Sequence, residues 1–226
     1  MVQKIRAARL SLTAAAVVLA GCGGGGSGSN PAPQPNLKSA SMPSQPMDIP
    51  STMLSATDSS GNVYTVTYSS TSGGMAMFGG QNASTSMIAI TIAENGAVIA
   101  TEDSTAYYLT NPYSLLGLSG MSNGAAWTAR VTGSSLVPTM LTVGDSGTLY
   151  SFMYLDGMGN TIGSLTETYT VNADSPTAVF FNVEAVGSIN GVQETETLTY
   201  AVAKDGTVQG LVQAQITVNG MTLTFN

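Results

Sequence analysis

The sequence predicts an all-β domain, an antiparallel meander of about eight to ten strands with a barrel-like form. In the C-terminal half, apolar residues such as Leu198, Tyr200 and Val202 recur at every second position. This period of two is typical of strands that are buried on one face. The pairs Asn190-Gly191 and Asn219-Gly220 separate such segments, and Asn-Gly favours tight hairpin turns because both residues tolerate positive φ. A β-sandwich is the alternative architecture.

The first 21 residues are typical of an export signal. Lys4, Arg6 and Arg9 form a positive start, and a short run of apolar and small residues follows over positions 10–20. This run is too short to cross a bilayer core of about 30 Å, which needs about 20 apolar residues. We therefore expect residues 1–21 to be a secretory signal peptide.

The signal ends in Leu19-Ala20-Gly21-Cys22, which contains the one cysteine of the chain. This motif resembles the lipobox of bacterial lipoprotein precursors. The resemblance implies cleavage before Cys22, diacylation of its sulfur by chains such as palmitate, and anchoring to a membrane. Because Gly23 rather than aspartate follows, the family analogy favours the outer membrane of the cell envelope, facing the periplasm or the exterior.

A tether is expected after the anchor, over residues 22–50, because this segment is rich in Gly and Ser and then in Pro. Such a composition cannot bury a core and behaves as a spacer. The remaining residues, 51–226, form one predicted β-domain.

Two related halves are a further expectation for this domain, at about 51–137 and 138–226. Residues 52–68 resemble residues 139–154, which suggests an internal duplication. The Pro- and Gly-containing segment 111–124 interrupts the strand pattern. We expect it to connect the halves, with a short helical turn at Leu115-Leu116.

Composition excludes several classes of function. The chain has no histidine and one cysteine, so His-dependent catalysis, His-ligated zinc and an internal disulfide are excluded. After the signal, only Lys38, Arg130 and Lys204 are basic, against 13 acidic residues. Nucleic acid binding needs clustered basic residues, so nucleic acid is not an expected partner. No motif indicates a cofactor.

Three glutamates carry the strongest candidate chemistry. Glu167, Glu194 and Glu196 share the phase of the apolar residues on their strands. If successive hairpins pair, the first and third strands run parallel and bring the three carboxylates to one end of the inner face. Paired carboxylates perform glycoside hydrolysis, and clustered carboxylate oxygens bind calcium. The alternative, which we favour, places Glu194 and Glu196 on a solvated rim at the start of a strand.

Other candidates are weaker. Met75 and Met77 carry thioethers on a Gly-flanked segment, and thioethers suit Cu(I). The segment 156–160 faintly resembles a calcium loop, but a plain hairpin turn is the preferred interpretation. Glu102-Asp103 is expected to be a solvated turn.

The sequence therefore predicts a lipid-anchored envelope protein with a non-catalytic β-domain, in a binding or structural role with an unidentified protein or small-molecule ligand. The alternatives are a carboxylate-based enzyme acting on glycans and a Met-based copper-binding lipoprotein.

Overall fold

The fold is all-β, as predicted, and was described in a computed structural model. The structure describes residues 36–42, 49–110, 113–122, 124–134, 138–218 and 220–226. Cys22, the signal and most of the tether lie outside this set. The described part of the chain contains no helix that is long and apolar enough to cross a membrane.

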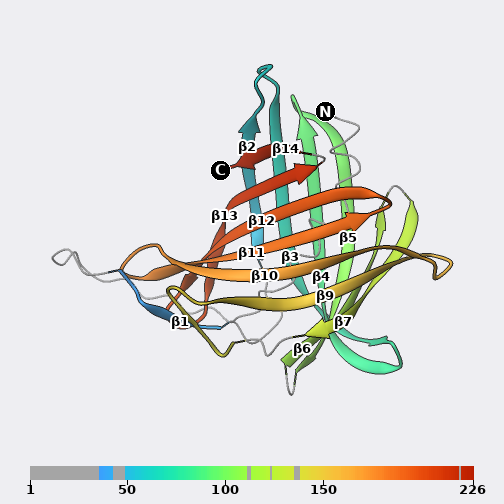
Figure 1. The fold of residues 1–226 in the computed structure, drawn as a ribbon, viewed down its shortest axis with the longest axis horizontal. Helices are drawn as coiled ribbons and strands as arrows, with labels where there is room; N and C mark the ends of the chain where they lie inside the picture. The colour runs from blue at the N-terminus through green and yellow to red at the C-terminus, as the bar shows by residue number, and fades with distance from the viewer. Residues whose placement is uncertain (1–35, 43–48, 111–112, 123, 135–137, 219) are drawn as a thin grey trace.

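Within the described residues, fourteen strands follow one another and are numbered in order (Figure 1). Their bounds are β1 Ser39–Ser41, β2 Ile49–Thr57, β3 Val63–Phe78, β4 Gln81–Glu94, β5 Ala97–Thr110, β6 Tyr113–Ser122, β7 Ala125–Ser134, β8 Met140–Thr142, β9 Ser146–Asp156, β10 Thr161–Ala173, β11 Ala178–Ile189, β12 Val192–Ala203, β13 Val208–Val218 and β14 Met221–Phe225.

Twelve of these strands form one antiparallel sheet in the order β14-β13-β12-β11-β10-β9-β7-β6-β5-β4-β3-β2. The sheet curls until its two edges meet, where Ser55 of β2 and Asn226, directly after β14, exchange backbone hydrogen bonds of 3.1 and 3.0 Å. The expected barrel-like meander is confirmed, although it has more strands than the eight to ten expected. The difference arises in the N-terminal half, where polar and Gly-rich segments weaken the alternation that marks a strand.

The segment 111–124 contains strand β6 rather than a connection with a helical turn. Leu115 and Leu118 are buried although they are three positions apart, because the ladder to β5 shifts register between Tyr107 and Tyr108. Gly117 lies at this irregularity. A local irregularity of this kind hides a period of two, which explains why the expectation was wrong.

The strands at the best-matched segments of the proposed duplication pair differently. β2 pairs with β3 inside the main sheet, whereas β8, at the equivalent sequence position, pairs with β1 in a separate two-stranded sheet. This small sheet adjoins β11 and β12, and Ser41 donates a backbone hydrogen bond to the carbonyl oxygen of Lys204 at 3.0 Å.

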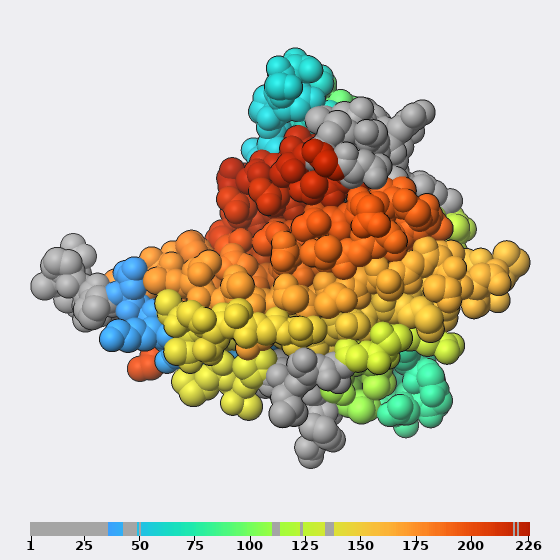
Figure 2. All heavy atoms as spheres, viewed as in Figure 1, coloured from blue at the N-terminus to red at the C-terminus, as the bar shows by residue number. Residues whose placement is uncertain are grey.

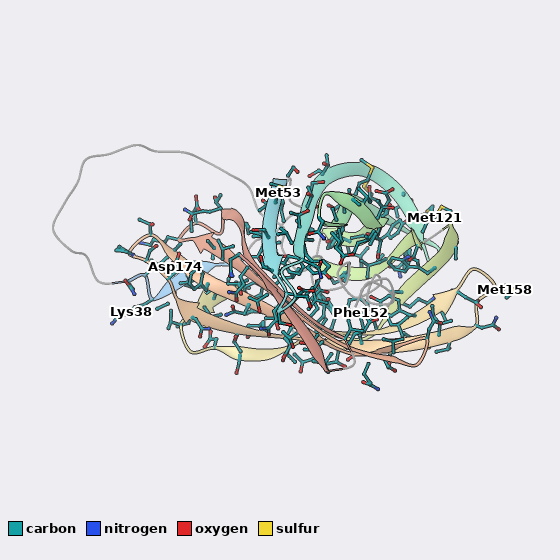
Figure 3. All side chains as sticks on the ribbon, turned by 90° about the horizontal axis from the view of Figure 1, so that it is seen from above. Lys38, Met53, Met121, Phe152, Met158 and Asp174 are labelled. Atoms are coloured by element: carbon teal, nitrogen blue, oxygen red, sulfur yellow. The ribbon has the colours of Figure 1, made fainter. Side chains whose placement is uncertain are left out.

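The core lies inside the curled sheet, between the flatter wall of β9–β13 and the more curved wall of β3–β7. Phe152 is labelled in this interior in Figure 3, and it is buried. Figure 2 shows the outer surface of the flatter wall as a continuous layer from yellow to red. On β13 the ladder to β12 shifts register, so the buried positions change phase along the strand: Leu211 is buried and Val212 is exposed, whereas Ala214 is buried.

Candidate functional site

The three predicted glutamates lie together on the inner face of the flatter wall. Glu167 of β10 is aligned with Ala185 of β11, which is aligned with Glu196 of β12. Glu194 lies two residues before Glu196 on the same strand, opposite Gly187. Glu167 and Glu196 are thus separated by two strand spacings, about 9.5 Å between their Cα atoms.

These carboxyl groups are buried rather than solvated. Glu167 and Glu196 are 0% exposed and Glu194 is 3% exposed, so the interpretation as a solvated rim is wrong. The small residues Ala185 and Gly187 beside them leave room for the longer glutamate side chains. Among the residues that the structure describes, neither carboxylate oxygen of Glu167 or Glu196 has a hydrogen-bond partner.

The curved wall adds a fourth buried carboxyl group that the sequence analysis missed. Glu102 belongs to β5 and is 4% exposed, so it does not lie in a solvated turn, whereas its neighbour Asp103 is exposed. The sequence pattern did indicate burial of Glu102, because Ala100, Ala106 and Tyr108 lie at the same alternate positions of the strand and are also buried. The adjacent acidic residue made the pair look like a turn.

Burial controls the protonation of this cluster. Loss of hydration raises the pKa of Glu167 well above its usual range, and repulsion from Glu196 raises it further. Burial likewise raises the pKa of Glu196, with repulsion from Glu194 and then Glu102 adding to it. Tyr154 lies among the same groups, and its pKa is raised first by burial and then by the nearby carboxylates. The interior therefore favours neutral carboxyl groups.

The cluster does not resemble a metal centre. In the part of the chain that the structure describes, no group of three or more Asp, Glu, Cys or His side chains is placed to bind a metal ion. A carboxylate site for calcium also needs oxygen atoms that converge on one point. A glycan cannot reach Glu167 or Glu196 in the closed barrel, because both are fully buried.

The segment with Met75 and Met77 forms a hook on the outside of the barrel. We define the hook as residues 73–84, the outer end of the β3–β4 hairpin (Figure 1). The ladder between the two strands is irregular from Ser72 to Met75, where the two glycines Gly73-Gly74 face Thr85 of β4. The extra residue bends the hairpin outward.

The tip of the hook packs back onto the outer face of the curved wall. The ring of Phe78 stacks on that of Tyr107 in β5, with centroids 4.5 Å apart and planes inclined by 26°. Gly117 makes this contact possible, since a Cβ atom there would lie 2.6 Å from the Phe78 ring. Met75 and Met77 face away from the packed side and are exposed.

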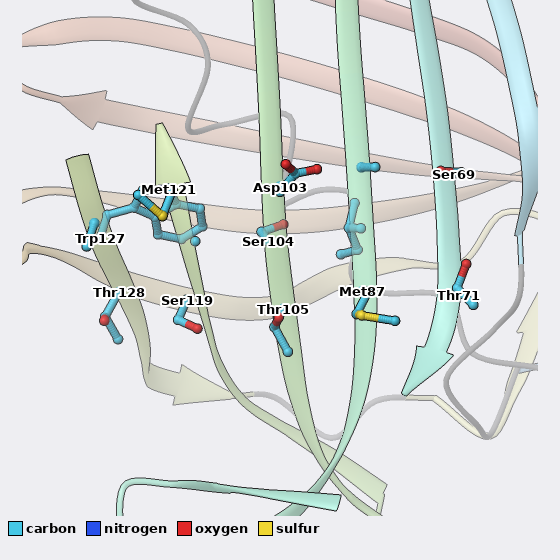
Figure 4. A pocket seen from close by; sticks show the side chains of 14 residues that line it. Ser69, Thr71, Met87, Asp103, Ser104, Thr105, Ser119, Met121, Trp127 and Thr128 are labelled. Atoms are coloured by element: carbon cyan, nitrogen blue, oxygen red, sulfur yellow. The ribbon is translucent and has the colours of Figure 1, made fainter. Parts of the chain in front are cut away.

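A groove of about 660 Å³ lies on the outer face of β3–β7, beside the bend of the hook (Figure 4). Asp103 carries the one charged side chain of its lining, and Met87 and Met121 contribute exposed thioethers. Trp127 lines the groove from below: its side chain is buried, and its ring lies against Gly120 and packs on Tyr154 of the interior, with centroids 5.6 Å apart. The remaining polar side chains of the lining are hydroxyl groups, those of Ser69, Thr71, Ser104, Thr105, Ser119 and Thr128.

The segment 156–160 is a hairpin turn between β9 and β10, which was the preferred interpretation of its sequence. The Asp156 carboxylate accepts hydrogen bonds from the backbone N–H groups of Met158 and Asn160 and from the Asn160 side chain, at 2.8 to 2.9 Å. Asp58 caps the β2–β3 turn in the same way, through Asn62. These carboxylates are used by their own turns rather than by a metal.

No protein family model matches this chain, and no curated protein or solved structure is significantly similar to it. The cluster, the hook and the groove are therefore the features that indicate a function.

Proposed function

We propose that this chain is an exported lipoprotein, anchored through Cys22 to the bacterial cell envelope, whose non-catalytic β-domain binds a small ligand in the groove beside the hook. The observation that carries the binding role is the groove itself. Its volume of about 660 Å³ falls within the range of small-molecule sites, about 300–1,000 Å³. The residues that line it come from five strands of a continuous sheet, so the site is supported by a rigid wall.

The charge of the groove selects the class of ligand. Asp103 offers a carboxylate and the lining has no Lys or Arg, so an anion would meet repulsion without a partner. The acidic domain adds to this preference. Hydroxyl groups and thioethers surround Asp103, which suits a small organic cation that has an amine or ammonium group and a short apolar part.

The alternative of a carboxylate enzyme receives less support, because Glu167 and Glu196 are buried and lie away from the outer groove. The copper alternative depends on Met75 and Met77, two exposed thioethers on one strand. Ser84 donates a hydrogen bond to the Met75 sulfur at 3.5 Å, which uses one lone pair of that ligand. Neither the buried glutamates nor the two exposed methionines therefore favour a second function.

Trp127 provides the test, because it is the one tryptophan of the chain and lies at the groove. Fluorescence would be titrated with choline and putrescine as cations and with acetate as an anion. We expect saturable changes with a cation and none with acetate. Asp103→Asn should weaken the cation response about tenfold or more, because it removes a charge-assisted contact.

Glu184→Gln is the matched control, since it also removes an exposed acid but lies on β11 of the other wall. It should leave the titration unchanged. No response to either cation, or equal responses in the Asp103→Asn variant, would contradict the proposed site. The anchor is tested separately, because Cys22→Ser should abolish incorporation of labelled palmitate and release the protein from membranes.

A further inference from the structure

The buried carboxyl cluster is not used by the proposed binding site, and its arrangement requires an explanation. Aligned residues run across the flatter wall from Glu167 through Ala185 and Glu196 to Ile216 and Leu223 of β14. Glu196 is therefore two strands from the edge at which the barrel closes. Buried polar groups without hydrogen-bond partners, as at Glu167 and Glu196, are rare in native proteins.

None of the basic side chains that the structure describes is buried with these groups. Lys38, which precedes the domain, and Arg130 and Lys204 within it are all exposed, and the chain has no histidine. An isolated carboxylate in an apolar interior is very unfavourable. Closure of the barrel around these groups therefore requires that they bind protons.

The other titratable groups that face the interior cannot supply a counter-charge either. From the curved wall these are Glu102 and the buried tyrosines Tyr64, Tyr68 and Tyr108, and from the flatter wall Glu194, Tyr150, Tyr154 and Tyr200. Every one of these groups is neutral or negative, so each ionisation adds repulsion. The two walls interact across the interior, since the charge of Glu102 acts on Glu196.

The edge between β2 and β14, where the barrel closes, is joined less extensively than the neighbouring strands of the flatter wall are. β14 has five residues and meets β2 through the Ser55 and Asn226 pair, whereas β10 and β11 are aligned over eleven residue pairs. Separation of this edge admits water to the interior and breaks few backbone hydrogen bonds. It is therefore the least costly way to hydrate an ionised Glu196.

We propose that the interior cluster is a proton-operated lock: Glu167 and Glu196 hold the barrel closed when protonated, and their ionisation opens the wall at the edge between β2 and β14. The lock does not depend on the groove, and its test is independent of ligand binding.

The direction of the effect follows from linkage. The pKa of each carboxyl is raised in the folded chain, so its contribution to stability is complete below the unfolded pKa of about 4.3 and is lost as pH rises toward the folded pKa. In this window each such group raises the unfolding equilibrium constant about tenfold per pH unit. Stability should therefore fall with rising pH. For the two glutamates together, the unfolding equilibrium constant should rise by up to about a hundredfold per pH unit.

The experiment is urea unfolding of the full chain from mildly acidic to mildly alkaline pH, with hydrogen exchange at the Ser55 amide. We expect lower stability at higher pH, and loss of Ser55 protection before that of Val183 in the centre of β11. Glu167→Gln and Glu196→Gln should each reduce the pH dependence of the unfolding free energy by the equivalent of about one bound proton. Glu184→Gln, an exposed glutamate on the strand between them, should leave the slope unchanged.

Stability that is constant or rises over this range in the unmodified chain would overturn the lock, whether or not the variants fold. A full pH slope in the double glutamine variant would also overturn it. Equal loss of protection at Ser55 and Val183 would contradict opening at the edge.

Discussion

Phe78→Ala is expected to detach the hook from the barrel. The Phe78 ring is half-buried and stacks on Tyr107 at a centroid distance of 4.5 Å. Truncation of a fully buried phenylalanine to alanine costs about 3–5 kcal/mol, and half of that range gives about 2 kcal/mol for this position. The figure includes the stacking energy of about 0.5–1.5 kcal/mol.

Urea unfolding measures this loss. With an m-value of about 2 kcal/mol/M, the midpoint should fall by about 1 M. Met77→Ala is the matched control: it removes an apolar side chain from the same strand, but Met77 is 62% exposed and faces away from Tyr107. An unchanged midpoint for Phe78→Ala, or an equal shift for both variants, would refute the docking of the hook.

Three further predictions concern single positions. Gly117→Ala should destabilise the fold by about 2 kcal/mol in the same urea assay, because its Cβ would collide with the Phe78 ring and the Ala129 carbonyl oxygen. Gly74→Ala places its Cβ in open space and should leave the unfolding free energy nearly unchanged. Tyr200→Phe should cost less than about 0.5 kcal/mol, since no described residue provides a hydrogen-bond partner for its buried hydroxyl. Tyr64→Phe should cost about 1 kcal/mol, because Tyr64 donates to Glu94 at 2.8 Å, and equal melting temperatures for the two variants would contradict this. Hydrogen bonds from Asn62 lower the pKa of Asp58, so the contribution of Asp58 to stability is present above the unfolded pKa and disappears as pH falls through the folded pKa. Asp58→Ala should therefore lower the melting temperature at neutral pH but not in strong acid. An equal loss in acid would contradict a stabilising role of the Asp58 carboxylate in its turn.

The sequence was sufficient for the fold class because regular alternation and tight turns dominate the C-terminal half. Strands β10 and β12 lie on either side of β11 and run parallel to each other, as expected, and this placed Glu167 and Glu196 on one inner face. Their depth was not predictable from the pattern. A glutamate near the start of a strand suggests a solvated end, and only the curling of the distant wall buries it.

The outer site was beyond sequence reasoning for a different reason. The groove combines residues of five strands from Ser69 to Thr128, which only the folded sheet brings side by side. The glycine pairs around Met75 and Met77 indicated an irregular segment. They could not show that Phe78 would stack on Tyr107, because that contact depends on the absence of a side chain at Gly117.

The protonation state of Glu167 and Glu196 in the folded chain is the most direct test of the closed barrel. Carbon-13 NMR of the glutamate carboxyl groups, assigned with the single glutamine variants, measures it residue by residue. We predict that both signals are those of neutral carboxyl groups at pH 7. Ionised signals for Glu167 and Glu196 at pH 7 in the folded chain would contradict a dry, closed interior.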